Sequence, residues 1–169
     1  MSAYQPFWCE ENIWQLTLDP AVGVGERLVV LISGISGHVA CWHQRAASVG
    51  EPVLWDYHVV MAVRHDGWMI WDLDTRLACP LPATTWLGRT FPCPTTLPLE
   101  FLPRFLVVPA SAYRRDLYSD RQHMRTGDGG WLRPPPPWPA PGIGSVTLTD
   151  YLRQTRNGLA LAEMNALFA

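Results

Sequence analysis

Two apolar segments joined by a short polar turn, residues 55–63 and 68–74, constrain the fold of this protein more than any other feature. The first segment reads WDYHVVMAV and the second reads WMIWDLD. Between them stands RHDG, whose Asp66-Gly67 pair is a strong signal for a β-hairpin. Because both segments are apolar on both faces of an extended strand, we expect this antiparallel pair inside a sheet rather than at its edge.

The flanking sequence predicts further helices and strands. Cys9, Ile13 and Leu16 follow helical spacing, which predicts a short helix over residues 9–18. Runs of apolar and β-branched residues predict strands at 27–33 and 105–109. The segment 38–46 fits either a short strand or the start of a helix.

The remaining segments have weaker patterns. Prolines punctuate residues 79–103, which we expect to be ordered loops with at most one helical turn. A helix or helical turn is predicted over 111–124, and a polyproline-II-like segment over 131–142. In the tail, residues 149–168 predict a helix with Thr149 or Asp150 as its N-cap.

Charge and length exclude several classes of protein. The 169 residues carry a net charge of −2, which argues against nucleic acid or an anionic membrane as the main partner. No run reaches the ~20 apolar residues that span a bilayer, and the first residues lack the features of a signal peptide. We therefore expect one domain over residues 1–169, in the cytoplasm, with reduced thiols.

The cysteines do not predict a metal site or a disulfide framework. They are scattered along the sequence, at positions 9, 41, 79 and 93, with no C-x-x-C pair. The nearest approach to a ligand cluster is His38, Cys41 and His43, whose spacing does not match the usual zinc patterns. We expect no metal and no cofactor.

Three polar residues stand out against the apolar background. Cys9 lies at the start of the predicted first helix, where the helix dipole lowers the pKa of a thiol. His58 lies in the first segment of the hairpin and Asp72 in the second. A thiol, an imidazole and a carboxylate on neighbouring elements are the groups that nucleophilic catalysis requires.

The register of the hairpin decides which aspartate faces His58. A loop over 64–66 places Asp72 directly opposite His58, whereas a loop over 65–67 places Asp74 there. A two-residue turn at 66–67 puts both aspartates on the face away from His58. The triad therefore requires a loop of odd length or a bulge, which the sequence permits.

Each of these residues also has a purely structural explanation. Cys9 stands near two tryptophans and fits a packed core thiol. A single histidine in an apolar strand is often a hydrogen-bonded core residue, and Asp72 and Asp74 fit a strand end where carboxylates bind loop amides. The pattern of residues alone leaves both explanations open.

Five blocks of the sequence resemble, in the same order, the protein N-terminal glutamine amidohydrolases. These blocks are CEENIW, VLWDYHVVM, WDLDT, SDRQHM and WLRPPPPWP, and the resemblance extends from about residue 4 to the tail. The segment after Leu16 and residues 34–47 depart from the eukaryotic members of the family.

This resemblance implies both a fold and an activity. The implied fold is α+β and similar to the transglutaminase and papain-like cysteine enzymes: an antiparallel sheet flanked by helices, three-layer α-β-α, with the nucleophile on a helix. The implied reaction deamidates an N-terminal glutamine to glutamate and releases ammonia through a thioester. The family's cysteine in CEEN corresponds to Cys9, its histidine in WDYH to His58 and the first aspartate of DLD to Asp72.

Selectivity for a terminal residue requires a group that binds the free α-ammonium, such as a carboxylate. Glu10 and Glu11 are the nearest candidates in sequence, although both also suit the positive end of a helix dipole. Asp120, Arg121 and His123 are expected to brace the loops of the active site.

The expected partners are proteins or peptides with a free N-terminal glutamine, acted on by a monomer. Two other classes of function use the same residues. A transglutaminase-like acyl transferase would pass the acyl group to an amine, and a cysteine peptidase would attack a backbone amide. The third class is a non-catalytic binding module of the same fold, in which the thiol is inert.

Overall fold

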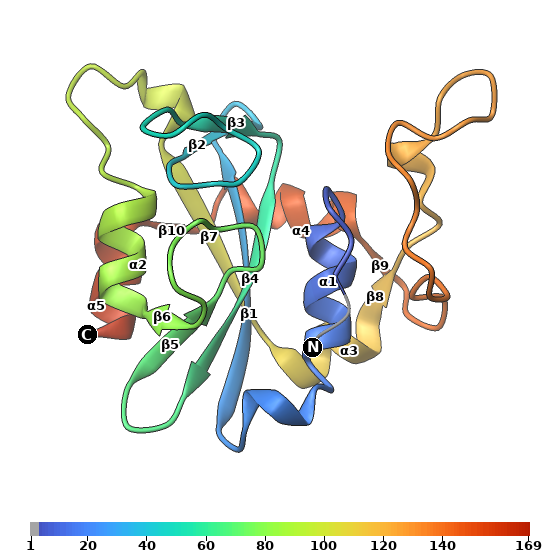
Figure 1. The fold of residues 1–169 in the computed structure, drawn as a ribbon, viewed down its shortest axis with the longest axis horizontal. Coiled ribbons are helices and arrows are strands. Elements are labelled where there is room, and N and C mark those ends of the chain that lie inside the picture. Colours follow the sequence, from blue (N-terminus) through green and yellow to red (C-terminus); the bar gives the residue numbers. More distant parts are fainter. Residues whose placement is uncertain (1–3) are drawn as a thin grey trace.

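A six-stranded antiparallel sheet forms the centre of the computed structural model, which describes residues 4–169 (Figure 1). The strand order is β10-β7-β1-β4-β5-β6, and all neighbouring pairs are antiparallel. The strands of this sheet are β1 (Glu26–Gly34), β4 (His58–Arg64), β5 (Trp68–Trp71), β6 (Leu81–Pro82), β7 (Pro103–Pro109) and β10 (Leu159–Ala160).

Short helices and two small strand pairs surround the sheet. The α-helices are α1 (Cys9–Leu16), α2 (Ala83–Thr90), α3 (Ala110–Asp116), α4 (Leu148–Thr155) and α5 (Leu161–Phe168). The small pairs are β2 (Val39–Cys41) with β3 (Val53–Trp55), which is antiparallel, and β8 (Leu117–Tyr118) with β9 (Val146–Thr147), which is parallel. Three 3₁₀ turns lie at Pro20–Val22, Leu99–Phe101 and Gln122–Met124. Across residues 4–169, none of the helices has the length and apolar character that crossing a bilayer requires.

Alternation along the central strands builds a separate core on each face of the sheet. Val29 and Leu31 of β1 belong to the core that includes α1, α3 and α4, whereas Val30 and Ile32 belong to the core that includes α2 and α5. Figure 1 shows the same division, with α2 and α5 on one side of the sheet and α1, α3 and α4 on the other. Helices therefore cover both faces, and Cys9 approaches from the α1 side.

The sheet confirms the predicted α+β class and the interior position of the hairpin. Strand β4 lies between β1 and β5, and β5 is covered in turn by the short β6. Arg64 pairs with Trp68, so the hairpin loop spans residues 65–67 and has odd length. The predicted strands at 27–33 and 105–109 correspond to β1 and β7.

The two hairpin strands are shorter than predicted, and the difference matters for the site. The segment predicted as one strand over 55–63 is divided, because Trp55 pairs with Val39 in the small β2–β3 sheet. The hydroxyl of Ser33 donates to the carbonyl of Asp56 at 2.7 Å and holds the bend between β3 and β4. Strand β5 ends at Trp71, so both aspartates of its predicted second half lie beyond the strand.

The prediction of loops with at most one helical turn over 79–103 was wrong, because α2 occupies Ala83–Thr90. Its buried residues include Ala83, Trp86, Leu87 and Thr90. These residues recur at intervals of three and four, which is helical spacing. Prolines on both sides of the segment hid this pattern, although Pro82 at the N-cap is compatible with a helix start.

The tail contains two helices rather than one. Helix α4 is capped by Thr147, whose hydroxyl accepts from the Asp150 amide while the Asp150 carboxylate accepts from the Thr147 amide. The predicted cap at Thr149 or Asp150 was therefore two to three residues late. Between the helices, β10 pairs with the edge of β7, and a Cβ at Gly158 would lie 2.1 Å from the Phe105 carbonyl oxygen. Close approach to β7 thus requires glycine and interrupts the helix.

Two further predictions were partly confirmed. The undecided segment 38–46 begins with a strand, β2, and then turns away from it. The helix predicted over 111–124 is α3, which ends at Asp116 where β8 begins.

Candidate active site

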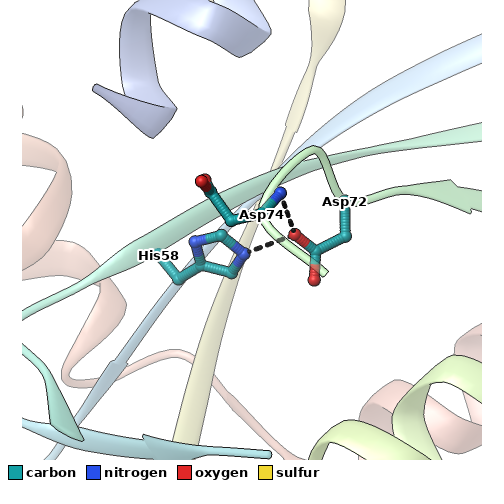
Figure 2. Close-up of side chains that lie close together, drawn as sticks. All are labelled: His58, Asp72 and Asp74. Atoms are coloured by element: carbon teal, nitrogen blue, oxygen red, sulfur yellow. Dashed lines mark hydrogen bonds and ion pairs between the residues drawn. The ribbon is translucent and has the colours of Figure 1, made fainter. Parts of the chain in front are cut away.

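His58 and Asp72 form a buried hydrogen-bonded pair at the end of the hairpin (Figure 2). His58 is the first residue of β4, and Asp72 follows the last residue of β5. Nε2 of His58 lies 2.9 Å from Oδ1 of Asp72, and both side chains are almost completely removed from solvent. With Nε2–H donating to the carboxylate, the other ring nitrogen, Nδ1, remains able to accept a proton.

The Asp72 carboxylate accepts hydrogen bonds from four donors. Besides His58, Oδ1 accepts from the Asp74 amide at 3.1 Å. Oδ2 accepts from Nε2 of Gln44 at 3.0 Å and from Nε1 of Trp86 at 3.1 Å. Two oxygens have about four lone-pair sites, so the carboxylate is saturated with donors and its orientation is fixed. Hydrogen bonds of this kind favour the charged carboxylate.

Opposing effects set the charge of this pair. Burial disfavours the charged imidazole, but the charge of Asp72, its hydrogen bond and the charge of Asp74 outweigh burial and raise the pKa of His58 above 6.5. Burial also opposes the Asp72 carboxylate, yet its contacts with His58, Gln44 and Trp86 hold its pKa below the ordinary value. The ring of His58 stacks on Trp55 at 6.4 Å between centroids. The imidazole is therefore held in one plane and stabilised in its charged form.

Cys9 is the first residue of α1 and lines the same pocket as His58. Burial raises the pKa of its thiol well above the ordinary value, and the charges of Glu10 and Asp74 raise it further. Hydrogen bonding from the backbone of Val59 and Glu10 acts in the opposite direction. The helix-dipole argument, which predicts a lowered pKa, is therefore outweighed by burial. In the free protein Cys9 is a protonated thiol that needs a base.

The segment before Cys9 is held in place by contacts with distant residues. Both side-chain atoms of Asn12 hydrogen-bond the backbone of Gln5, at 2.8 Å each. The indole of Trp8 donates to the carbonyl of Pro134 at 2.9 Å. Trp8 is also the N-cap of α1 and offers no side-chain acceptor. No side chain at the N-cap therefore satisfies the amides of the first helical turn.

The pocket has a volume of about 730 Å³. Cys9, His58 and Asp74 lie in its wall, together with Trp55 and Tyr57 before β4. The remaining wall comes from residues 7, 54 and 56, from 118–120 and 122–124, and from 132–133, 147–149 and 152. An open cavity that places a thiol and an imidazole in one wall fits a site for a small amide or the end of a polypeptide.

Comparison with known proteins is consistent with this geometry. The model of the N-terminal glutamine amidase family matches residues 4–162. The chain belongs to this family. It is 34% identical over 157 residues to the protein N-terminal glutamine amidohydrolase of Bos taurus, covering 88% of this chain and 76% of the relative. The Homo sapiens protein of the same name is 34% identical over 157 residues, with 88% and 77% covered. The Arabidopsis thaliana one is 34% identical over 146 residues, with 80% and 66% covered.

Among the family blocks, the second glutamate of CEEN anchors the loop that follows α3. The Glu11 carboxylate, fully buried, accepts from Nε and Nη2 of Arg121 at 2.8 and 2.7 Å. It also accepts from Nε1 of Trp138 at 3.1 Å and from the hydroxyl of Ser119. This set joins the SDRQHM and WLRPPPPWP blocks to α1. Glu11 therefore holds the loops together and does not line the pocket.

The first glutamate of CEEN lies behind the thiol. Oε2 of Glu10 accepts from the hydroxyl of Tyr57 at 2.9 Å and lies 3.8 Å from Sγ of Cys9. Oε1 lies 3.4 Å from Nε2 of His123, an ion pair when that imidazole is protonated. Glu10 is fully buried and is not part of the pocket wall. The third residue predicted to brace the loops, Asp120, accepts from the Gln122 amide at 2.9 Å.

Sequence reasoning missed Gln44 and Trp86, the two residues that hold the second oxygen of Asp72. Gln44 comes from the stretch 34–47 that had no clear pattern, and Trp86 comes from the unpredicted helix α2. Helical spacing of Ala83, Trp86 and Leu87 was the signal that could have located Trp86. No comparable pattern marked Gln44. A β-bridge to Thr75 places the backbone of Gln44 beside the segment that follows β5, and its side chain bonds Asp72 directly.

Within residues 4–169, His58, Asp72 and Asp74 are the one group of three possible metal ligands with ligand atoms within 4.8 Å of one another. A metal ion would need a free lone pair on each of these three side chains at the same time, and Asp72 has none to spare. Both oxygens of Asp72 already accept from protein donors, and one of those donors is His58 itself. The donor set therefore suits a charge-stabilised imidazole better than a cation.

Proposed function

We propose that this protein hydrolyses the side-chain amide of an N-terminal glutamine, in proteins or peptides, to glutamate and ammonia, with Cys9 as the nucleophile. The observation that carries the proposal is the buried His58–Asp72 pair, whose histidine lines the same pocket as Cys9. Membership of the N-terminal glutamine amidase family, whose relatives are named protein N-terminal glutamine amidohydrolases, supports the substrate.

In the first half of the reaction, Nδ1 of His58 takes the proton of the Cys9 thiol. Sγ then forms a bond to the side-chain amide carbon of the glutamine. The fixed Asp72 carboxylate keeps the proton on Nε2 and stabilises the imidazolium that forms. Because the pKa of the Cys9 thiol is raised, proton removal must accompany attack rather than precede it.

The tetrahedral intermediate carries a negative oxygen that needs donors. Amides in the first turn of α1, including that of Cys9, are suited to this task because a helix start has no internal partners for them. The positive end of the helix dipole adds to their effect. The bond between the attacked carbon and the amide nitrogen then breaks, and the imidazolium of His58 gives its proton to the departing ammonia.

A thioester between Cys9 and the glutamyl group remains. Neutral His58 takes a proton from water, and the resulting hydroxide attacks the thioester carbon. The bond between carbon and sulfur breaks, the imidazolium returns its proton to the sulfur, and glutamate leaves. Every proton in this sequence passes through His58, so no metal or organic cofactor is required by the chemistry.

The proposal extends to the molecule as a whole. We assign residues 1–169 to one catalytic domain of the three-layer transglutaminase and papain-like type, acting as a monomer in the cytoplasm. Helices on both faces of the sheet, with the thiol at a helix start, support the fold type. Four free cysteines fit a reducing compartment. A net charge of −2 argues against nucleic acid or an anionic membrane as the main partner.

The proposal is tested by incubating the protein with peptides that begin with Gln, Asn or acetyl-Gln. Ammonia release and the mass of each peptide are followed for the unmodified protein, Cys9→Ala and Asp72→Asn. We expect ammonia from the free Gln peptide alone, with glutamate replacing glutamine. Cys9→Ala should abolish the release.

Other outcomes favour the alternative functions. Deamidation of acetyl-Gln, or an adduct when an amine is added, would indicate a transglutaminase-like acyl transferase. Shorter peptides would indicate a peptidase. No ammonia from any peptide would contradict the proposal and leave a binding module of the same fold.

A further inference from the structure

The relatives' name specifies an N-terminal residue, yet neither glutamate of CEEN lies in the pocket wall. We propose that Asp74 binds the α-ammonium group of the substrate and thereby restricts the reaction to N-terminal residues. This inference rests on the proposed function, because it names the residue that recognises the substrate at the same site.

Asp74 is placed to make this contact. Its side chain lines the pocket together with Cys9 and His58. In Figure 2 the Asp74 carboxyl points away from Asp72, while its backbone amide points toward Asp72. Oδ1 accepts from the hydroxyl of Tyr4 at 2.6 Å. Oδ2 accepts no hydrogen bond from residues 4–169, so no donor in this range occupies that oxygen.

The dimensions of glutamine agree with this position. Four bonds separate the side-chain amide carbon from the α-nitrogen, a span of roughly 5 Å when extended. The group that binds the ammonium must therefore lie about one glutamine side chain's length from the thiol and its base. Asp74 offers an oxygen within 4.8 Å of ligand atoms on His58 and Asp72.

The other carboxylates near the site are less suitable. Glu10 and Glu11 are fully buried and do not line the pocket. Glu11 pairs with Arg121, and Glu10 accepts from Tyr57 through Oε2, whereas its Oε1 has no hydrogen bond among residues 4–169. Asp56 and Asp120 line the pocket but face water, and Asp56 pairs with His38 at 3.3 Å. Asp74 is only 9% exposed. A charge-assisted hydrogen bond to an ammonium is stronger in such a place than at an exposed carboxylate.

Charge coupling to the nucleophile gives Asp74 a second effect. Its negative charge is one of the causes that raise the pKa of the Cys9 thiol. An ammonium group beside Asp74 would cancel that charge and bring the thiol pKa down when the substrate binds. Substrates without the ammonium would leave the thiol protonated. Recognition of the terminal amine and activation of Cys9 would then occur in the same event.

The test compares two substrates in two variants. One peptide begins with glutamine, and the other is its desamino counterpart, in which hydrogen replaces the α-amino group. Asp74→Asn keeps an oxygen for the Tyr4 hydroxyl but loses the charge. We expect kcat/KM for the glutamine peptide to fall roughly 10- to 150-fold, the range for a hydrogen bond to a charged group. Activity on the desamino peptide should stay the same or rise.

Matched variants show whether the effect belongs to Asp74. Asp56→Asn removes an exposed carboxylate from the same pocket and should preserve the preference for the free amine. Equal losses on both peptides in Asp74→Asn, or an unchanged preference, would overturn the proposal. Loss of the preference in Glu10→Gln instead would assign the ammonium to Glu10 and would also overturn it.

A binding measurement separates this proposal from the proposed reaction. Calorimetry with Cys9→Ala should show tighter binding of the glutamine peptide than of its desamino counterpart. The same preference should disappear in Cys9→Ala/Asp74→Asn. If the unmodified protein releases no ammonia, the proposed reaction fails and the binding preference alone decides the role of Asp74. Absent or equal binding of the two peptides by Cys9→Ala would overturn that role.

Discussion

Asp72 is the residue whose environment is most fully determined. Its two oxygens accept from His58, the Asp74 amide, Gln44 and Trp86. The position therefore requires a side chain whose two polar atoms are both hydrogen-bond acceptors. An asparagine has one oxygen and one NH₂ group. In either orientation its NH₂ group would face two donors.

We therefore expect Asp72→Asn to lose kcat by roughly 10³- to 10⁴-fold, as in other triad enzymes. With the amide NH₂ toward His58, Nε2 must accept, and Nδ1 then carries the proton and cannot take one from Cys9. Ammonia release from a Gln peptide measures this loss. Asp116→Asn, at a residue that pairs with Arg115 and does not line the pocket, serves as the control. A loss below tenfold would contradict the role of Asp72.

The protonation of His58 gives a second prediction. The charge of Asp72 holds the pKa of His58 above 6.5 against the opposing effect of burial. Removing that charge leaves burial, the largest effect, opposed only by the smaller effect of Asp74, so the pKa of His58 should fall. An NMR titration of the His58 ring should give a pKa above 6.5 in Cys9→Ala and below 6.5 in Cys9→Ala/Asp72→Asn. The reverse order would mean that the pair is not coupled as described.

At the residue scale, Cys9, His58 and Asp72 could be singled out from the sequence as candidates, but strand register alone could not choose between Asp72 and Asp74 as the partner of His58. The observed loop over 65–67, continued in regular register, would bring Asp74 opposite His58. The backbone instead leaves the strand after Trp71, and Asp72 turns to reach the imidazole. A strand end depends on tertiary contacts such as those of Gln44 and Trp86, which no local pattern reports.

Helix α1 is the element that joins Cys9, the proposed nucleophile, to the rest of the site. Glu11 in its first turn is fully buried and binds Arg121, whose side chain is 13% exposed. This pair fixes the loop that carries part of the pocket wall against the helix that begins with Cys9. Removal of one partner would leave the other charge buried without compensation.

Arg121→Ala should therefore lower the free energy of unfolding by about 3 kcal/mol or more. Urea denaturation measures this change. Arg115→Ala removes an exposed arginine that pairs with Asp116, and it should change stability little because surface ion pairs contribute little. Equal stability of the two variants would contradict the role assigned to the Glu11–Arg121 pair.

Helix α2 supports the site from the opposite face of the sheet. Trp86→Phe keeps an aromatic ring in the core but removes the indole N–H that Asp72 accepts. We expect a loss of about 1–3 kcal/mol in stability, since a buried acceptor loses a donor. Activity should also fall, because the carboxylate is less firmly oriented. Trp68→Phe, at a tryptophan packed on Phe168 of α5, is the control that should leave activity unchanged.

At the element scale, the hairpin and the two other long strands could be predicted because their apolar runs are continuous. Helix α2 could not be found so easily, because its flanking prolines resemble loop signals. The break between α4 and α5 depends on backbone contact between Gly158 and β7. Contacts of that kind are tertiary and leave little trace in the periodicity of the tail.

The whole molecule brings together groups that are distant in sequence. The two helical layers hold opposite faces of one sheet, and the site forms where β4 begins and β5 ends (Figures 1 and 2). The Cys9 thiol comes from the α1 side, whereas Trp86, which orients Asp72, comes from the α2 side. Sequence patterns predicted the hairpin, α1, β1 and β7 of this arrangement but not α2.

The central claim is that Cys9 carries the substrate's acyl group during the reaction. The most direct measurement is the intact mass of the protein, quenched in acid during a single turnover with a Gln peptide. We predict a transient adduct with the mass of the peptide less that of ammonia, located on Cys9 by fragmentation. An adduct on another residue, or ammonia release by Cys9→Ala at the rate of the unmodified protein, would contradict this claim.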